Sequence, residues 1–260
     1  MRVVTWNCKG ALHKKISYVS ALHPDLLIIP ESERIDSVPM ELEGGIPSSV
    51  IWQGNTPRKG LAVIAYGDYH IQIHPRYVPE HKWIIPIIVT GPTSFLLLAV
   101  WTLPIEETGS YVQPLFEAHE RYQDSFDDLP VMWAGDFNAN FVFDIPRRQY
   151  KFRDFVSLLG ERDIVSLYHS QTESQNGDEV DETFFLYHHR DKGYHIDYFF
   201  ACPRLRKGGF HITLGLPEDW LDKSDHMPVI CDLNTNGKIK EAEQAASCNH
   251  YQPPCFDAFP

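Results

Sequence analysis

The chain has 260 residues, of which 43% are hydrophobic and 13% aromatic, enough apolar material to build one large folded domain. Its 35 acidic and 23 basic side chains give a formal net charge of −12, which argues against a protein that binds nucleic acid tightly through a broad basic surface. A substrate that carries phosphate would have to be held locally, by a metal ion or a small group of basic residues.

Short apolar runs bounded by Gly, Pro and polar residues predict strands along the chain. These runs cover 2–7, 25–31, 60–66, 70–74, 83–89, 95–102, 131–138, 183–189, 195–202, 210–216 and 227–233. Helical periodicity is confined to the neighbourhoods of 11–22, 112–126 and 152–164, each between two strand candidates. Runs that are apolar throughout suit strands covered on both faces, whereas 70–74 alternates between apolar and polar residues. The pattern predicts an α/β protein with two packed, mixed sheets and outer helices.

The two ends of the chain differ in character. Residues 1–7 lead directly into a strand, without the apolar stretch and cleavage site of a secretory signal, so we expect a cytoplasmic protein. No apolar run is long enough to predict a membrane span. Residues 235–260 are polar and end in a Pro-rich segment, which predicts a catalytic domain at 1–234 followed by a polar C-terminal tail.

The cysteines give no sign of a disulfide framework or a zinc site. Cys8, Cys202, Cys231, Cys248 and Cys255 include no CxxC pair, and three of the five lie in apolar runs, so we expect reduced thiols that pack as small hydrophobic groups. In the tail, the spacing of Cys248, His250 and Cys255 matches no common zinc pattern.

Polar residues follow or begin several of the predicted strands. They are Asn7, Glu31, Asp136 and Asn138 of the GDFN sequence at 135–138, Asp197 of IDY at 196–198, and Asp225 with His226 in SDH at 224–226. Side chains at strand ends lie at the rim of a sheet, where several strands can direct them into one site. Such an oxygen-rich set suits Mg²⁺, with Mn²⁺ as an alternative, and does not suit structural zinc.

Taken in order, Asn7, Glu31, the GDFN sequence, the IDY sequence and SDHMPV at 224–229 resemble the endonuclease/exonuclease/phosphatase superfamily, across residues 2–233. This resemblance implies a four-layer α/β sandwich, with two mixed β-sheets packed face to face and helices outside. It also implies that the active site lies at one edge of the sandwich and that the enzyme hydrolyses phosphate esters with an activated water.

The resemblance also implies roles for individual residues. Glu31 is similar to the principal metal-binding carboxylate, which Asn7 assists, and Asp225 completes the metal shell. Asp136 is similar to the residue that orients or deprotonates the attacking water, with Asn138 holding it or the phosphate. His226 resembles the imidazole that meets the phosphate oxygens or transfers a proton, with Asp197 bonded to its far nitrogen.

Two positions depart from the nuclease pattern and leave the substrate class open. Thr102 stands before Pro104, where family members commonly have a Tyr or His that contacts the phosphate, and Lys9 stands where some of the nucleases have an Asp. We expect Asn7, Lys9, Lys59 and Thr102 to contact substrate, because Lys59 directly precedes a predicted strand near the rim and the others lie beside the motifs.

Three functions are consistent with these residues. The leading interpretation is a nuclease that cleaves phosphodiester bonds in DNA or RNA. A phosphatase or phosphodiesterase for a small molecule, such as a nucleotide, an inositol phosphate or a phospholipid head group, is favoured by the acidic charge and by Thr102. A non-catalytic binding module is disfavoured because Asp136 and His226 are both present. The oligomeric state is left open by the sequence.

Overall fold

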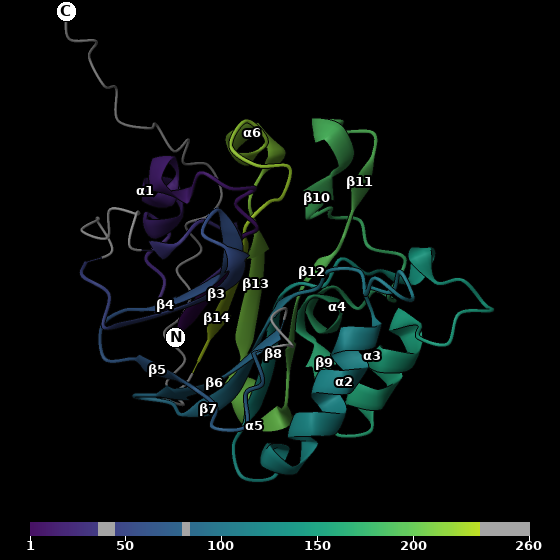
Figure 1. Ribbon diagram of the computed structural model, residues 1–260, viewed down its shortest axis with the longest axis horizontal. Coiled ribbons are helices and arrows are strands. Elements are labelled where there is room, and N and C mark those ends of the chain that lie inside the picture. Colours follow the sequence, from purple (N-terminus) through teal and green to yellow (C-terminus); the bar gives the residue numbers. More distant parts are fainter. Residues whose placement is uncertain (36–44, 80–83, 235–260) are drawn as a thin grey trace, which may run out of the picture.

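A computed structural model of the chain describes residues 1–35, 45–79 and 84–234. The predicted tail at 235–260, with Cys248, His250 and Cys255, lies outside the described residues. Two six-stranded sheets dominate the described part, with a small two-stranded sheet beside them. Figure 1 shows the two large sheets in the middle of the molecule and helices on either side.

The first sheet has the strand order β13-β14-β1-β2-β4-β3. Its strands are β1 (Arg2–Thr5), β2 (Leu26–Ser32), β3 (Ser49–Thr56), β4 (Lys59–Ala65), β13 (Phe210–Leu214) and β14 (Val229–Leu233). β1 lies parallel to β2 and antiparallel to β14, and the other pairs are antiparallel, so the sheet is mixed. The N-terminal strand is therefore an interior strand, with the last strand of the domain beside it.

The second sheet has the order β5-β6-β7-β8-β12-β9. Its strands are β5 (His70–Ile73), β6 (Ile84–Thr90), β7 (Phe95–Trp101), β8 (Val131–Asp136), β9 (Val165–Ser166) and β12 (Asp197–Ala201). Only β7 and β8 pair in parallel within this sheet of the described chain. The prediction of two mixed sheets is confirmed.

Alternation along the strands of the first sheet shows how the layers are packed. Val3, Leu26 and Ile28 belong to the large core cluster, which also contains Leu97 and Trp133 of the second sheet. Their sequence neighbours Val4, Leu27 and Ile29 belong to a separate cluster on the opposite face. Because successive strand residues point to opposite faces, the first sheet is covered on both sides and packs on the second sheet.

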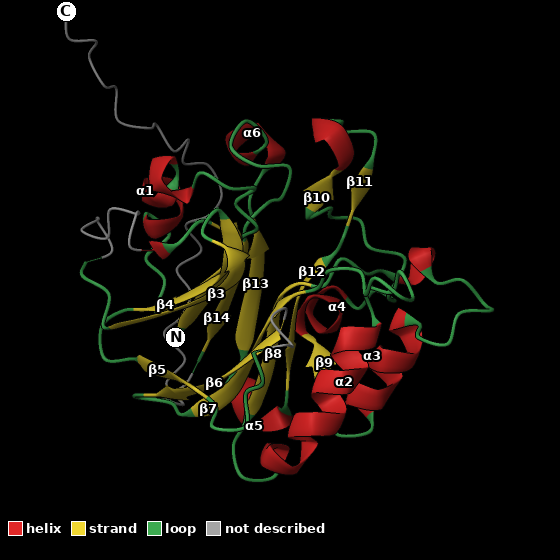
Figure 2. Cartoon of the chain, in the orientation of Figure 1, coloured by secondary structure: helices red, strands yellow, loops and turns green. Residues whose placement is uncertain are grey.

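Helices form the two outer layers (Figure 2). On the second sheet, α2 (Gln113–Tyr122) and α3 (Phe152–Gly160) bury Leu115, Tyr122 and Phe155 in the large core. On the first sheet, the 3₁₀ helix η1 (Leu12–Lys14) and α1 (Ile16–Ser20) pack against the smaller cluster, together with α6 (Pro217–Trp220). The four-layer sandwich predicted from the resemblance is thus found. The short helices α4 (Leu167–Thr172) and α5 (Pro203–Arg206) complete the set of α-helices in the described chain.

The segment 183–189, which the sequence predicts as one strand, departs from that prediction. It contains the short strand β10 (Phe184–Phe185), which pairs with β11 (Gly193–Tyr194), and then the 3₁₀ turn η5 (Leu186–His188). Tyr187 and His188 have φ angles of 56° and 59°, and this left-handed backbone cannot continue a strand. The chain therefore turns back over the end of the sandwich.

Several other elements also differ from the predictions. The helix expected at 11–22 is divided into η1 and α1, and the helix expected at 152–164 ends at Gly160. Strand β3 was not predicted, because its edge position leaves most of its residues partly or fully exposed and removes the apolar signal.

The described cysteines, Cys8, Cys202 and Cys231, are free and buried, as predicted. Within the described residues, no helix combines the length and apolar character required to cross a bilayer. The cytoplasmic location stays a prediction.

Candidate active site

Two buried aspartates face each other at one end of the second sheet. Asp136 is the last residue of β8, Asp197 is the first residue of β12, and antiparallel pairing puts them directly opposite each other. Both are fully buried. Gly135 permits the close approach of β8 to its other neighbour, β7, because a side chain at its Cβ position would collide with the carbonyl of Val100. Pairing of β8 with two neighbours thus fixes both carboxylates before any ligand arrives.

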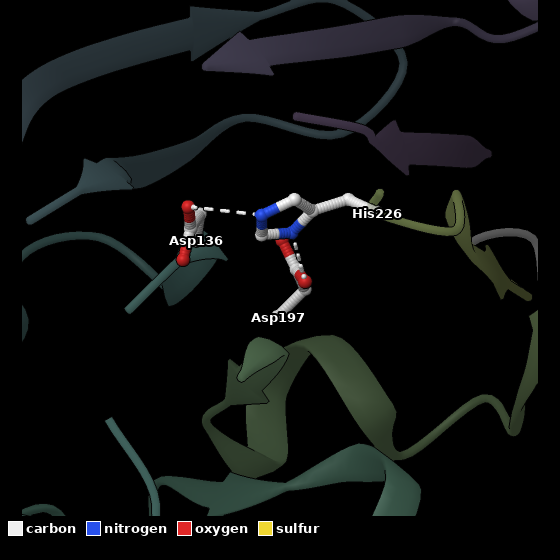
Figure 3. A group of neighbouring side chains, drawn as sticks. All are labelled: Asp136, Asp197 and His226. Atoms are coloured by element: carbon white, nitrogen blue, oxygen red, sulfur yellow. Dashed lines mark hydrogen bonds and ion pairs between the residues drawn. The ribbon is translucent and has the colours of Figure 1, made fainter. Parts of the chain in front are cut away.

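His226 lies between these two carboxylates (Figure 3). Its Nδ1 lies 2.9 Å from Asp197 Oδ2, and its Nε2 lies 4.0 Å from Asp136 Oδ2. The backbone around His226 is held in place, since Trp6 Nε1 donates to its carbonyl and its own N–H donates to Ser224 Oγ. Three of the four side chains predicted as catalytic, those of Asp136, Asp197 and His226, are therefore one contiguous group.

Two more predicted site residues, Asn7 and Asn138, donate hydrogen bonds to the carboxylate of Asp136. Asn7, just beyond β1 in the first sheet, donates from Nδ2 to Asp136 Oδ2 at 2.9 Å. Asn138 donates its backbone N–H to Oδ1 at 2.9 Å and its side-chain amide to Oδ2 at 3.1 Å. Asp136 thus accepts three hydrogen bonds, and one of them joins the ends of the two sheets.

Thr102 is fully buried behind this group. Its hydroxyl donates to the carbonyl of Phe137, and its own carbonyl accepts from Asn138 Nδ2. In this structure Thr102 holds the turn that follows β8, and a contact with substrate stays a prediction.

Burial and charge shift the pKa values of Asp136 and His226 in the same direction for different reasons. Burial, together with the neighbouring Asp197, raises the pKa of Asp136 to about 7, against the opposing effects of His226, Asn7 and Asn138. Burial alone would lower the pKa of His226, but Asp197 and Asp136 outweigh it and raise that pKa to about 9. The two aspartates therefore favour the cationic form of His226, and burial makes Asp136 a stronger base than an exposed aspartate.

Thr183 supports Asp197 and was missed in the sequence analysis. Its buried hydroxyl donates to Asp197 Oδ2 at 2.7 Å and accepts the backbone N–H groups of Ile196 and Asp197. A threonine inside a predicted strand carries no signal of such a role, because the role depends on the turn that brings 183 beside β12. The ring of Phe184, the next residue, lies 4.7 Å from the ring of His226.

The predicted metal ligands lie at the same end of the first sheet. The backbone N–H of Cys8 bonds to the carbonyl of Pro30, which holds the segment with Asn7 beside the end of β2 that carries Glu31. Ser224 Oγ donates to the carbonyl of Asn7. Each of the two predicted ligand carboxylates has a lysine partner: Glu31 Oε2 lies 2.9 Å from Lys59 Nζ, and Asp225 Oδ2 lies 2.7 Å from Lys9 Nζ.

A divalent cation fits the chemistry of this rim. Glu31 offers a partly exposed carboxylate whose present partner is a cation, and Asp197 has a buried Oδ1 without a hydrogen-bond partner. Asp136, Asp197 and His226 also offer one ligand atom each within 4.8 Å of one another, so this buried group could hold a metal as well. Hard oxygen donors of this kind suit Mg²⁺ or Mn²⁺. The assignment of Asn7, Glu31 and Asp225 as its ligands stays a prediction.

A second buried polar network supports the loop after Asn138. Glu179 accepts from Asn140 Nδ2 at 3.1 Å, from the backbone N–H of Gly177 at 3.0 Å and from His169 Nε2 at 2.9 Å. Burial acts to raise the pKa of Glu179, but these hydrogen bonds outweigh it and lower that pKa from 4.5 to about 2. The ionised form is therefore built into the folded state.

This network predicts a pH-dependent loss of stability. Because the folded-state pKa is depressed, the contribution of Glu179 is present above about pH 4.5 and is lost as the pH falls toward about 2. At pH 7 we expect Glu179→Gln to lower the free energy of unfolding by about 3 kcal/mol, and by progressively less below pH 4.5. Urea unfolding at several pH values measures this difference. Asp127→Asn, which removes an exposed ion pair with Arg162, should change stability little; equal effects of both changes would contradict the account.

Comparisons with known proteins support the fold. No protein-family model and no curated protein matches the sequence. Among solved structures, the chain is similar to a 3′-5′ exonuclease, NExo, from Neisseria meningitidis, at 18% identity and a TM-score of 0.63, over 90% of this chain and 100% of that chain. It is similar to an AP endonuclease from Archaeoglobus fulgidus at 17% identity and a TM-score of 0.66, over 90% and 99% of the two chains.

A third similar structure is the Neisseria 3′ phosphatase NExo bound to a product DNA hairpin, at 17% identity and a TM-score of 0.65, again over 90% of this chain and 99% of that chain. These similarities, each over about 90% of this chain, confirm the α/β sandwich fold that the sequence motifs imply.

Proposed function

We propose that this chain hydrolyses phosphodiester bonds in nucleic acid, in a metal-dependent reaction in which Asp136 and His226 act on an attacking water and a phosphate. The observation that carries the proposal is the buried group of Asp136, His226 and Asp197, which Asn7 joins to the other sheet. Burial of two carboxylates and an imidazole is costly, and such groups with shifted pKa values are typical of catalytic sites.

Asp136 is suited to take a proton from water. Its pKa is raised to about 7, near neutral pH, where a general base combines a useful ionised fraction with enough basicity. Hydrogen bonds from Asn7 and Asn138 fix the carboxylate, so it does not have to reorient when a water approaches. Orienting that water also supplies much of the rate, because the attack is then confined to one direction.

His226 is suited to meet the phosphate. With a pKa of about 9 it is cationic at neutral pH, and Asp197 occupies Nδ1, so Nε2–H is the donor that remains for a non-bridging oxygen. A positive donor at this place stabilises the negative charge that accumulates on the phosphoryl oxygens during attack. Thr183 and Asp197 keep the ring in this orientation.

A divalent cation, Mg²⁺ or Mn²⁺, would be held by Glu31 with Asn7 and would supply positive charge that offsets the charge of the phosphate. Lys59 Nζ lies 2.9 Å from Glu31 Oε2, so it would also be close to a phosphate bound at this metal and would contact one of the phosphate oxygens. These roles for Glu31, Asn7 and Lys59 are part of the proposal.

Nucleic acid is the proposed substrate because one similar structure holds a DNA hairpin, and others are described as an exonuclease and an AP endonuclease. A test uses the purified full chain with Mg²⁺ or Mn²⁺ on labelled single- and double-stranded DNA and RNA, with and without a chelator. We expect metal-dependent cleavage of at least one polymer.

A second arm of the same test uses a DNA end that carries a 3′ phosphate and a set of small phosphate esters, with release of inorganic phosphate as the readout. Phosphate release without cleavage of any polymer would replace the nuclease by a phosphatase, which one similar protein is also described as. If neither polymer cleavage nor phosphate release is observed, the proposal is contradicted.

Glu31→Gln tests the metal ligand. The amide keeps the shape of the side chain but removes its charge, so we expect the Mg²⁺ concentration for half-maximal activity to rise roughly tenfold or more. Glu33→Gln is the matched control two residues along, since Glu33 is engaged by the backbone N–H groups of Leu12 and His13. An unchanged Mg²⁺ requirement in the Glu31 variant would remove this residue from the metal site.

A further inference from the structure

Lys9 reaches from the loop after β1 to the loop before β14. Its Nζ donates to Asp225 Oδ2 at 2.7 Å and lies 3.0 Å from His188 Nε2. The side chain of Asp225 is only 13% exposed, whereas that of Lys9 is 45% exposed. The ammonium therefore sits on a carboxylate and an imidazole that two separate loops bring together.

The hydrogen bonds of His188 show that this position is suited to a cation. Nδ1 of His188 lies 2.9 Å from the carbonyl oxygen of Leu221, which can only accept, so Nδ1 carries the ring proton. Nε2 then presents a lone pair toward Lys9. An imidazole nitrogen and a carboxylate oxygen directed at one point are typical ligands of a cation, and Lys9 supplies that cation from within the chain.

The backbone that carries Lys9 is fixed in an unusual conformation. Lys9, Gly10 and Ala11 all have left-handed φ angles, of 53°, 74° and 53°. Such angles are unfavourable for residues with a Cβ, and they persist only where surrounding contacts enforce them. Here the N–H of Lys9 donates to Oδ1 of Asn7, and Lys15 Nζ donates to the carbonyl of Cys8. The direction of Lys9 is thus tied to Asn7, which also holds Asp136.

We infer that the Lys9 ammonium takes the place of a divalent ion at the position formed by Asp225 and His188. A metal ion is then held on the Glu31 side alone, and Asp225 is a partner of Lys9 rather than a metal ligand. This inference rests on the proposed function for its metal and substrate. Lys9 acts as a positioning residue there, since its charge holds Asp225, the residue before His226, without a metal having to bind.

The test measures Mn²⁺ binding by electron paramagnetic resonance, with the full chain and without substrate. We expect Lys9→Met to bind one more Mn²⁺ per chain than wild type, with affinity at the new position raised roughly tenfold or more, because a unit positive charge has left two ligands free. Lys9→Arg keeps the charge and should show no gain. Lys14→Met removes the charge of an exposed residue at the end of the nearby helix η1 and should also show none.

The double variant Lys9→Met/Asp225→Asn should lose the additional ion. Circular dichroism of each variant checks that it is folded, and the Lys9→Arg protein separates an effect of charge from an effect of the strained turn. The inference is overturned if Lys9→Met binds no more Mn²⁺ per chain than wild type, or if Lys14→Met gains as much Mn²⁺ as Lys9→Met. Both outcomes count regardless of how many ions the wild type binds. Wild type without any bound Mn²⁺ would instead contradict the metal dependence under the proposed function, so the two failures are distinguishable.

Discussion

Asp136→Asn is expected to reduce the rate of cleavage by about 10³-fold or more, because the amide cannot take a proton from water. We expect little change in the free energy of unfolding. Removal of a buried charge favours the folded variant, while the new amide N–H₂ faces the donors on Asn7 and Asn138 and costs a comparable amount.

The experiment compares single-turnover cleavage and urea unfolding of the wild type and this variant. Asp232→Asn is the matched control, since Asp232 forms a partly exposed ion pair with Arg2 and lies at the far end of β14. It should keep wild-type activity. Retained activity in Asp136→Asn would remove Asp136 from the reaction, and loss of folding in that variant would leave Asp136 a structural residue.

His226→Ala is expected to lose both activity and stability, which distinguishes it from Asp136→Asn. Loss of the cationic donor should cost roughly 10²–10³-fold in rate. The change also leaves Asp197 and Asp136 buried without their counter-charge, and breaking a buried pair in this way costs about 3–5 kcal/mol. Cleavage assays and urea unfolding measure the two effects separately.

The pH dependence of that stability difference has a definite sign. His226 has a folded-state pKa of about 9, above its ordinary value of 6.5, so its contribution is complete below about pH 6.5 and is lost as the pH rises through about 9. The difference between wild type and His226→Ala should therefore shrink from pH 6 to pH 9.5. Adding Asp197→Asn should restore part of the stability and none of the activity. A variant as stable as wild type at pH 6 would falsify the ion-pair account.

The large elements of the fold could be predicted because their apolar periodicity is strong. β7 is apolar at every position and β1 alternates between two buried clusters, so both read as strands in the sequence. β3 carries no such signal, because an edge strand with an exposed face keeps polar residues. The short helices α4, α5 and α6 are fixed by their packing against neighbouring elements, which a local pattern does not reveal.

The candidate site was predictable where a motif marks a strand end. Asp136, Asp197 and His226 were expected to cooperate, and the structure places them in contact. His188 lies in the segment 183–189 that the sequence predicts as a strand, and the left-handed turn at 187–188 breaks that strand and redirects the side chain. Its contact with Lys9 spans 179 positions in the sequence, and no local pattern encodes a pairing at that range.

The central place of β1 in its sheet also determines when the proposed active site can first be complete. β1 needs β14 as a neighbour, and Ser224 bonds to Asn7 across 217 positions. A chain that is still being synthesised therefore has neither a complete sheet nor His226 until residues 224–233 have left the ribosome. An unfinished polypeptide therefore carries Asp136 and Glu31 without His226, and the proposed site is completed only when the last strand of the first sheet has been made.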